Sequence, residues 1–182
     1  ERELREGYQE RQRRRKARER LLDFTLFTKP DYWVNWHHRH ICSRLNAFLR
    51  GEVKRLMLFV GPQTGKSELV SRRLPALAFG RNPDEKIIAC SHTAGLASDM
   101  NRDVQRIIDD DTYRRLFPGT QLYGQFSRSS ARYTYQRNSD MFELVGHHGY
   151  YRSAGGGGAI AGKGFSLGIV DDPFPNREAA DS

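Results

Sequence analysis

Hydrophobic residues occur along the chain in short apolar runs that alternate with helically spaced segments. The runs at 55–60 (RLMLFV), 86–90 (KIIAC) and 165–170 (FSLGIV) are largely apolar, which is typical of strands buried on both faces of a parallel sheet. Helical spacing over 96–108 predicts an amphipathic helix, and similar spacing over 36–49 predicts another. The predicted fold class is therefore α/β, with a mainly parallel central sheet flanked by helices.

Other segments carry weaker patterns. Residues 23–35, punctuated by Pro30, are predicted to begin irregularly before the helix over 36–49. A helix is predicted to open at Lys66, and Pro75 is predicted to end or kink it because proline lacks an N–H group. The segment 132–153 is predicted to hold short strands joined by a polar turn.

Charge distinguishes the N-terminal segment from the rest of the chain. The 182 residues carry a net charge of +8, which suits a polyanionic partner. Residues 1–20 hold nine Arg or Lys and five Glu, and so contribute half of that excess. This basic helical arm is either a solvated or frayed helix, or a surface that contacts phosphates or a partner. We divide the chain into an arm and lead-in (1–30) and a domain (31–182).

Hydropathy and cysteine content bear on where the protein acts. No apolar run approaches the roughly 18 residues needed to cross a bilayer, so no membrane partner is expected. Cys42 and Cys90 stand alone without metal-binding or redox spacing, which favours a reducing compartment.

The stretch LMLFVGPQTGKSELV, residues 56–70, reads as a phosphate-binding loop between a strand and a helix. Gly65 lets the backbone approach a triphosphate, Lys66 reaches the β- and γ-phosphate oxygens, and Ser67 offers its hydroxyl to Mg²⁺. The copy departs from the GxxxxGK[ST] pattern, because Val60 stands where the first glycine belongs. The residues predicted to contact ATP are Gly61, Pro62, Gln63, Thr64, Gly65, Lys66, Ser67 and Glu68.

A second loop supplies carboxylates. LGIVDD ends an apolar run with Asp171, predicted to hold Mg²⁺ together with Ser67, and Asp172, predicted to polarise the attacking water. The alternative is that the two aspartates cap a turn before Pro173. Because ligands of open α/β sheets bind at the carboxyl ends of strands, we expect both loops to meet there.

Three blocks of the sequence resemble the large terminase subunit of tailed bacteriophages, the ATPase motor that packages DNA into the procapsid. They are WHHRHICSRLNAFLRGEVKRLMLFVGPQTGKSEL, YRRLFPG and SAGGGGAIAGKGFSLGIVDDPFPNREAADS. The resemblance implies an additional-strand (ASCE) P-loop NTPase, with Lys66 and Ser67 in Walker A and Asp171 in Walker B. The catalytic carboxylate of such motors is usually Glu, whereas Asp172 stands here. A coupling motif and a nuclease domain follow in the family, so the chain is expected to hold an incomplete ATPase domain without nuclease activity.

The resemblance also suggests further contacts. Lys163 lies between glycines before the Walker B strand, where related terminases carry a basic residue. We predict that it acts as a trans-acting finger, which reaches the γ-phosphate bound by the next subunit, and Arg152 is the alternative candidate. Related motors hold adenine in the segment before the phosphate loop, so Trp33, Trp36 and His37 are candidate base contacts. The alternative, which we favour, places Trp36 and Ile41 in the core of a helix beside the sheet.

The predicted function is ATP hydrolysis with Mg²⁺ that powers the translocation of double-stranded viral DNA into a procapsid. The expected partners are this DNA, the portal protein, the small terminase subunit and further copies in a ring, in the host cytoplasm at the procapsid. One alternative is a helicase-like or recombination-type P-loop ATPase. Another is a nucleotide-binding assembly module without turnover.

Overall fold

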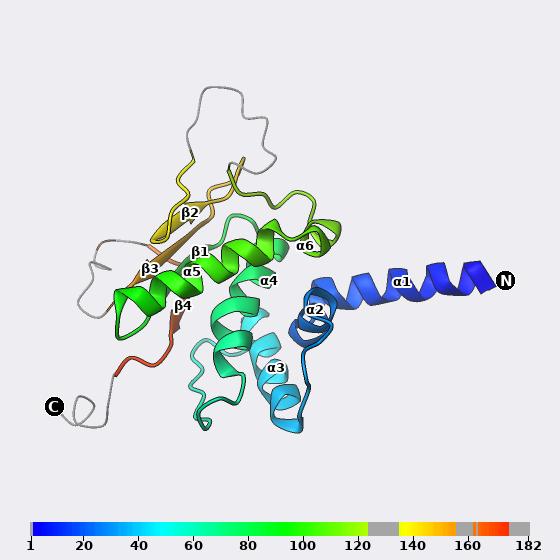
Figure 1. Cartoon of the computed structure of the whole chain (residues 1–182), viewed down its shortest axis with the longest axis horizontal. Helices are drawn as coiled ribbons and strands as arrows, with labels where there is room; N and C mark the ends of the chain where they lie inside the picture. Colours follow the sequence, from blue (N-terminus) through cyan, green and yellow to red (C-terminus); the bar gives the residue numbers. More distant parts are fainter. Residues whose placement is uncertain (1, 124–134, 156–161, 163, 175–182) are drawn as a thin grey trace.

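The chain folds as a small mixed sheet with helices packed on it (Figure 1). A computed structural model describes residues 2–123, 135–155, 162 and 164–174. Its elements, in chain order, are α1 (Arg2–Glu19), α2 (Leu21–Thr28), α3 (Trp36–Leu49), the π-helix η1 (Glu68–Arg73), α4 (Leu74–Arg81), β1 (Lys86–Cys90), α5 (Ala94–Asp109), α6 (Asp111–Leu116), β2 (Met141–Glu143), β3 (Tyr150–Ala154) and β4 (Leu167–Val170).

The four strands lie in the order β2-β3-β1-β4. Central β1 pairs in parallel with β3 and β4, whereas β2 pairs antiparallel with β3. The predicted α/β character with mostly parallel strands is therefore confirmed among the described residues. Because the three parallel strands run in one direction, the residues after Cys90, Ala154 and Val170 meet at one edge of the sheet.

One face of the sheet is covered by helices. The register places Ile87 and Ala89 of β1 beside Tyr151 of β3 and beside Leu167 and Ile169 of β4, and all five residues are buried. Helix α5 packs against β3 and η1, and Figure 1 shows it crossing the sheet. Since side chains alternate between faces, Asp171, the second residue after Ile169, also belongs to the covered face.

The buried strand predicted at 55–60 is wrong. Among the described residues no strand includes this segment, and Met57 and Phe59 are 81% and 89% exposed. Leu56 and Leu58 pack partly against the core, so side chains alternate between inside and outside. A strand needs a neighbour for its backbone N–H and C=O groups, and within the part of the chain described here none pairs with this segment. Apolar character alone therefore does not place it in the sheet.

The helix that opens at Lys66 continues through Pro75. It passes through η1 over Glu68–Arg73, and α4 follows directly. Pro75 lies in the first turn of α4, where a residue without an N–H group is tolerated. The predicted break is thus a change from π to α winding, and the segment stays helical up to Arg81.

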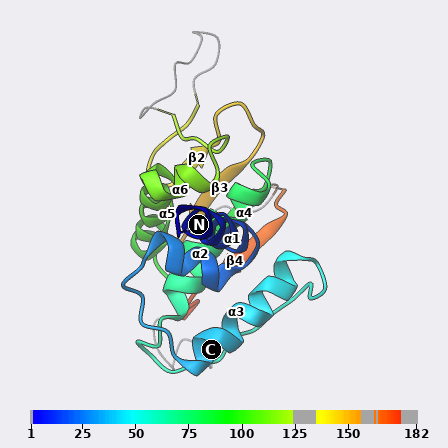
Figure 2. The same ribbon diagram turned by 90° about the vertical axis from the view of Figure 1, so that its right-hand side faces the viewer.

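The N-terminal helices dock on the core, as the view in Figure 2 shows. Residues 23–28 were predicted to be irregular, but they belong to α2, because tertiary burial stabilises a helix this short. The fully buried Phe24 ring lies 6.0 Å from the Tyr113 ring and 6.3 Å from the Phe117 ring. Helix α1 is mostly exposed, but near its end Arg18 Nε donates a hydrogen bond to the Leu116 carbonyl at 2.9 Å.

The remaining predictions have mixed outcomes. The helices over 36–49 and 96–108 and the strands at 86–90 and 165–170 are confirmed, with small shifts at their ends. Two strands of the 132–153 segment are β2 and β3, whereas residues 132–134 and most of the glycine-rich stretch lie outside the described residues. None of the described helices has the length and apolar character needed to span a bilayer.

Candidate functional site

The structure brings together the two loops singled out in the sequence. The Lys66 Nζ atom lies 2.8 Å from Asp171 Oδ1 and 2.5 Å from Asp172 Oδ1. Lys66 comes from the start of the helix that leads into η1, and the aspartates directly follow β4. An ammonium group therefore bridges two carboxylates that lie more than a hundred residues away in the sequence.

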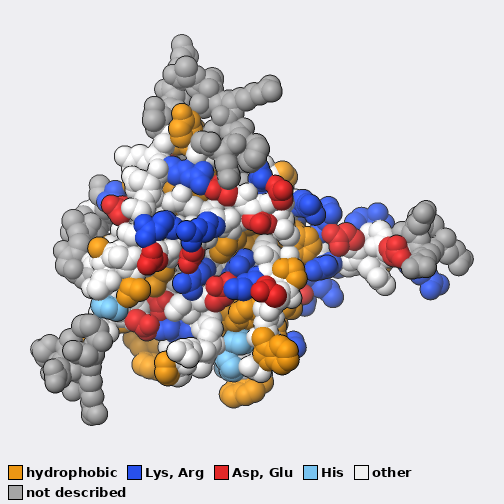
Figure 3. All heavy atoms as spheres, viewed as in Figure 1, with side chains coloured by type: hydrophobic (Ala, Val, Ile, Leu, Met, Phe, Trp, Pro, Cys, Tyr) orange, Lys and Arg blue, Asp and Glu red, His pale blue; other side chains and the backbone are white. Residues whose placement is uncertain are grey.

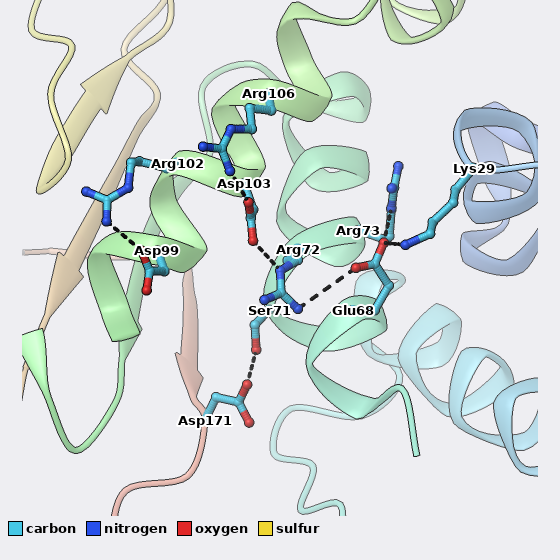
Figure 4. Close-up of polar contacts among 10 residues, drawn as sticks. All are labelled: Lys29, Glu68, Ser71, Arg72, Arg73, Asp99, Arg102, Asp103, Arg106 and Asp171. Atoms are coloured by element: carbon cyan, nitrogen blue, oxygen red, sulfur yellow. Dashed lines mark hydrogen bonds and ion pairs between the residues drawn. The ribbon is translucent and has the colours of Figure 1, made fainter. Parts of the chain in front are cut away.

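Asp171 is the buried member of this cluster. It is 3% exposed, and its Oδ2 atom accepts a hydrogen bond from Ser71 Oγ at 2.6 Å (Figure 4). Burial alone would raise the pKa of Asp171, but hydrogen bonds from Lys66, Ser71 and Ser67 outweigh burial and hold that pKa below its usual range. The carboxylate is therefore kept ionised by donors from a single helical segment.

Asp172 is the accessible member, with a side chain that is 66% exposed. Its φ of 46° lies in the left-handed region, which Asp tolerates better than most residues. The Asp172 carbonyl accepts the His92 backbone N–H at 3.2 Å and lies 2.9 Å from His92 Nδ1. His92, two residues after β1, thus holds the Asp172 backbone, while the Asp172 carboxylate remains open to solvent on one side.

Lys66 is held in its charged form by the two aspartates. Burial lowers the pKa of Lys66, but hydrogen bonds and charges from Asp171 and Asp172 raise it by more, so the net direction is upward. The Lys66 contribution to stability is complete below the ordinary lysine pKa of about 10.4 and is lost as the pH rises through the higher folded-state value.

Removing the Lys66 charge is expected to raise the pKa of Asp171. In the wild type this pKa is lowered, so the ionised carboxylate stabilises the fold above the ordinary Asp pKa of about 3.9 and loses this effect as the pH falls through the folded-state value. In Lys66→Met the Asp171 titration midpoint should therefore lie at higher pH, and the ionised carboxylate should stabilise the fold by less at neutral pH. An NMR titration of the Asp171 Cγ shift checks this, and an unchanged midpoint would contradict it.

The Gly61–Ser67 loop is tightly turned. Gln63 and Gly65 have φ values of 57° and 80°, and Thr64 Oγ1 donates a hydrogen bond to the Gly61 carbonyl at 2.8 Å. A left-handed backbone at Gly65 favours glycine. The short internal bond of Thr64 closes the loop on itself.

Glu68, predicted to contact ATP, has its carboxylate engaged in ion pairs. Its Oε1 atom lies 2.8 Å from Arg73 Nε and 3.5 Å from Lys29 Nζ, and Arg72 Nε lies 2.6 Å from Asp103 Oδ2 (Figure 4). These contacts tie η1 to α2 and to α5. The structure thus gives Glu68 a bracing role between helices.

The aromatic segment before the loop differs from the favoured prediction. Ile41 is buried at 3%, as predicted, but Trp36 is 81% exposed and is not a core residue. Trp36 is the first residue of α3, whereas Ile41 lies on the buried side of the helix with Cys42 and Leu45. The His37 ring packs edge-on to Trp36, and His37 Nε2 lies 3.2 Å from the Thr64 carbonyl oxygen. His37 thus contacts the loop, whereas Trp36 faces solvent.

The structure describes one of the two residues predicted as a trans-acting finger. Lys163 lies outside the described residues. Arg152 lies in β3, half-buried, with Nη2 3.4 Å from Met141 Sδ.

Sequence reasoning missed three residues that hold the site. Ser71 binds Asp171, His92 binds the Asp172 carbonyl, and His38 binds the Thr64 carbonyl at 2.7 Å. Ser71 had a usable signal, because a small polar residue one turn after Ser67 lies on the same side of a helix. Neither histidine had such a signal, since each reaches a backbone carbonyl that is distant in sequence.

Comparison with protein families shows which family the chain belongs to. The family described as "Terminase large subunit, T4likevirus-type, N-terminal" matches residues 57–182, which is more than half of the chain. The chain belongs to this terminase family. The terminase match includes Lys66, Asp171 and Asp172, confirms the resemblance seen in the sequence, and supports a role in viral DNA packaging. Comparison with curated proteins and with solved structures gives no match.

Proposed function

We propose that the chain binds and hydrolyses Mg-ATP and that this hydrolysis drives the translocation of double-stranded DNA during packaging. The observation that carries the proposal is the bridge from Lys66 to Asp171 and Asp172. When Mg-ATP binds, the Lys66 ammonium group would contact phosphate oxygens instead of the carboxylates. The carboxylates would then be available to the cation and to water. P-loop NTPases use these residue types in such an arrangement.

The donor set suits Mg²⁺. The described residues contain no cluster of three or more His, Cys, Asp or Glu side chains able to enclose a metal. Mg²⁺ needs no such cage, because it takes one or two protein oxygens and completes its shell with phosphates and water. Ser67 and Asp171 would hold the ion, and it would neutralise charge on the phosphate oxygens. The hydrogen bond from Ser71 keeps Asp171 ionised and oriented for this role.

The remaining assignments follow from exposure and loop geometry. The backbone N–H groups of Gly61–Ser67 would bind phosphate oxygens, with Lys66 at the β- and γ-phosphates. The exposed Asp172 carboxylate would accept a proton from water. The exposed Trp36 ring offers a surface for the base, with His37 next to it.

DNA contact is proposed for the basic arm. The arginines of α5 are paired with neighbouring acids, Arg102 with Asp99 at 2.5 Å and Arg106 with Asp103 at 2.7 Å. Figure 3 shows both charges mixed over the face that α5 crosses, and basic side chains interspersed with acidic ones along α1. Contacts of this kind bind phosphates without reading sequence, so DNA affinity should fall steeply with salt. The portal, the small terminase subunit and neighbouring copies in a ring remain proposed partners, with action at the procapsid in the host cytoplasm.

The test is the Mg²⁺-dependent release of phosphate from ATP, with and without linear double-stranded DNA, together with the ATP dissociation constant. Wild type should bind and hydrolyse ATP. Lys66→Met should bind ATP roughly 10- to 100-fold more weakly, because it loses a charge-assisted contact. Binding without turnover in the wild type would favour the assembly module, and no binding would overturn the proposal.

A further inference from the structure

Two histidines of α3 hold the Gly61–Ser67 loop by a backbone carbonyl. The Thr64 carbonyl oxygen lies 2.7 Å from His38 Nε2 and 3.2 Å from His37 Nε2. His38 is 6% exposed, and its ring lies 4.0 Å from the His37 ring and 5.1 Å from the Tyr32 ring. The closer contact therefore comes from a side chain that is buried and packed on both sides.

The partners of His38 determine its tautomer. The Asn35 backbone N–H donates to His38 Nδ1 at 3.0 Å, so Nδ1 carries no proton. Nε2 must then carry the ring proton and donate it to the Thr64 carbonyl. One ring thus joins the start of α3 to the loop, with a separate nitrogen for each contact.

This contact orients the peptide group between Thr64 and Gly65. In a trans peptide the C=O and N–H groups point in opposite directions, so holding the Thr64 carbonyl toward α3 turns the Gly65 N–H away from α3. A Cβ atom at Gly65 would lie 2.8 Å from Tyr32 Oη and 2.9 Å from His38 Nε2. The Gly65 backbone therefore lies directly against these two side chains. Because glycine has no Cβ, this peptide can rotate if the anchor is removed.

We propose that His38, supported by His37, is a positioning residue that fixes the Thr64–Gly65 peptide so that the Gly65 N–H is already directed at the phosphates before nucleotide binds. The inference rests on the proposed nucleotide site and adds a residue that the phosphate-loop motif does not contain. Its physical content is preorganisation: a donor that is already oriented costs no ordering when the ligand arrives.

The two contacts of His38 are separable by substitution. In His38→Gln the side-chain amide nitrogen reaches the place of Nε2 and can still donate to the Thr64 carbonyl. In His38→Asn the shorter side chain places its oxygen where Nδ1 accepts from Asn35 and does not reach Thr64. The first variant keeps the loop contact, and the second keeps the helix contact.

The experiment measures Gly65 ¹⁵N relaxation by NMR in the nucleotide-free chain, which reports how freely the Thr64–Gly65 peptide moves, and the ATP dissociation constant. The proteins compared are wild type, His38→Gln, His38→Asn and His38→Ala. His38→Asn and His38→Ala should show larger-amplitude Gly65 backbone motion and about tenfold weaker ATP binding, the effect of one lost hydrogen bond. His38→Gln should remain near wild type in both. In thermal unfolding, His38→Asn should have a higher midpoint temperature than His38→Ala, because it keeps the contact with the Asn35 N–H at the start of α3.

Two results would overturn the inference. One is unchanged Gly65 ¹⁵N relaxation in His38→Asn. The other is a His38→Gln variant as impaired as His38→Ala, which would show that His38 serves only to start α3. Failure of the proposed function has a different signature. The wild type would then bind no ATP, while the Gly65 relaxation data from the nucleotide-free chain would still decide whether His38 orients the loop.

Discussion

Replacing Asp172 by Asn is expected to lower ATP turnover by about 10²–10⁴-fold while leaving the ATP dissociation constant near the wild-type value. The amide is nearly isosteric and can still accept a hydrogen bond from Lys66, but it cannot take a proton from water. Asn also tolerates the left-handed backbone found at Asp172, so the loop after β4 should keep its shape. Measurement of single-turnover rates and of nucleotide affinity separates these effects.

Two further variants sharpen this prediction. Asp172→Glu supplies the longer carboxylate usual in related motors and should retain turnover, whereas Asp171→Asn should chiefly raise the Mg²⁺ concentration needed for half-maximal activity. The different exposures of the two aspartates, 3% and 66%, are the structural basis for expecting different defects. If Asp172→Asn hydrolysed ATP at the wild-type rate, Asp172 would have no role in activating water.

Replacing Phe24 by Ala is expected to lower the free energy of unfolding by about 3–5 kcal/mol. Phe24 is fully buried and packs against Tyr113 and Phe117, so its removal leaves a cavity between α2 and the α6 region. The matched control is Phe59→Ala, which truncates the same side chain where it is 89% exposed and should change stability by no more than about 0.5 kcal/mol. Urea unfolding of both variants measures the difference.

This pair of variants tests the two places where sequence prediction and structure differ most. Phe24 lies in a segment predicted to be irregular, and Phe59 lies in a segment predicted to be a buried strand. A large loss of stability in Phe59→Ala with little change in Phe24→Ala would mean that residues 55–60 are packed in solution and that α2 is not.

Local patterns in the sequence were sufficient for several elements and for picking out the residues that meet at the candidate site. The apolar run at 86–90 is β1, and the helical spacing over 96–108 is α5, because such patterns depend only on neighbours in the chain. The GKS tripeptide and the Asp pair were likewise recognised from residue type and spacing. Their proximity was a prediction from strand polarity, and Lys66 does contact both aspartates.

Burial and pairing were decided only by the tertiary structure. The run at 55–60 is apolar enough for a strand, but a strand exists only where another backbone satisfies its hydrogen bonds, and none of the described strands does so. Trp36 has the spacing of a core residue but lies at an exposed helix start, and Phe24 is buried because α6 happens to pack beside it. The anchors Ser71, His38 and His92 likewise act on atoms distant in sequence, and no local pattern encodes such contacts.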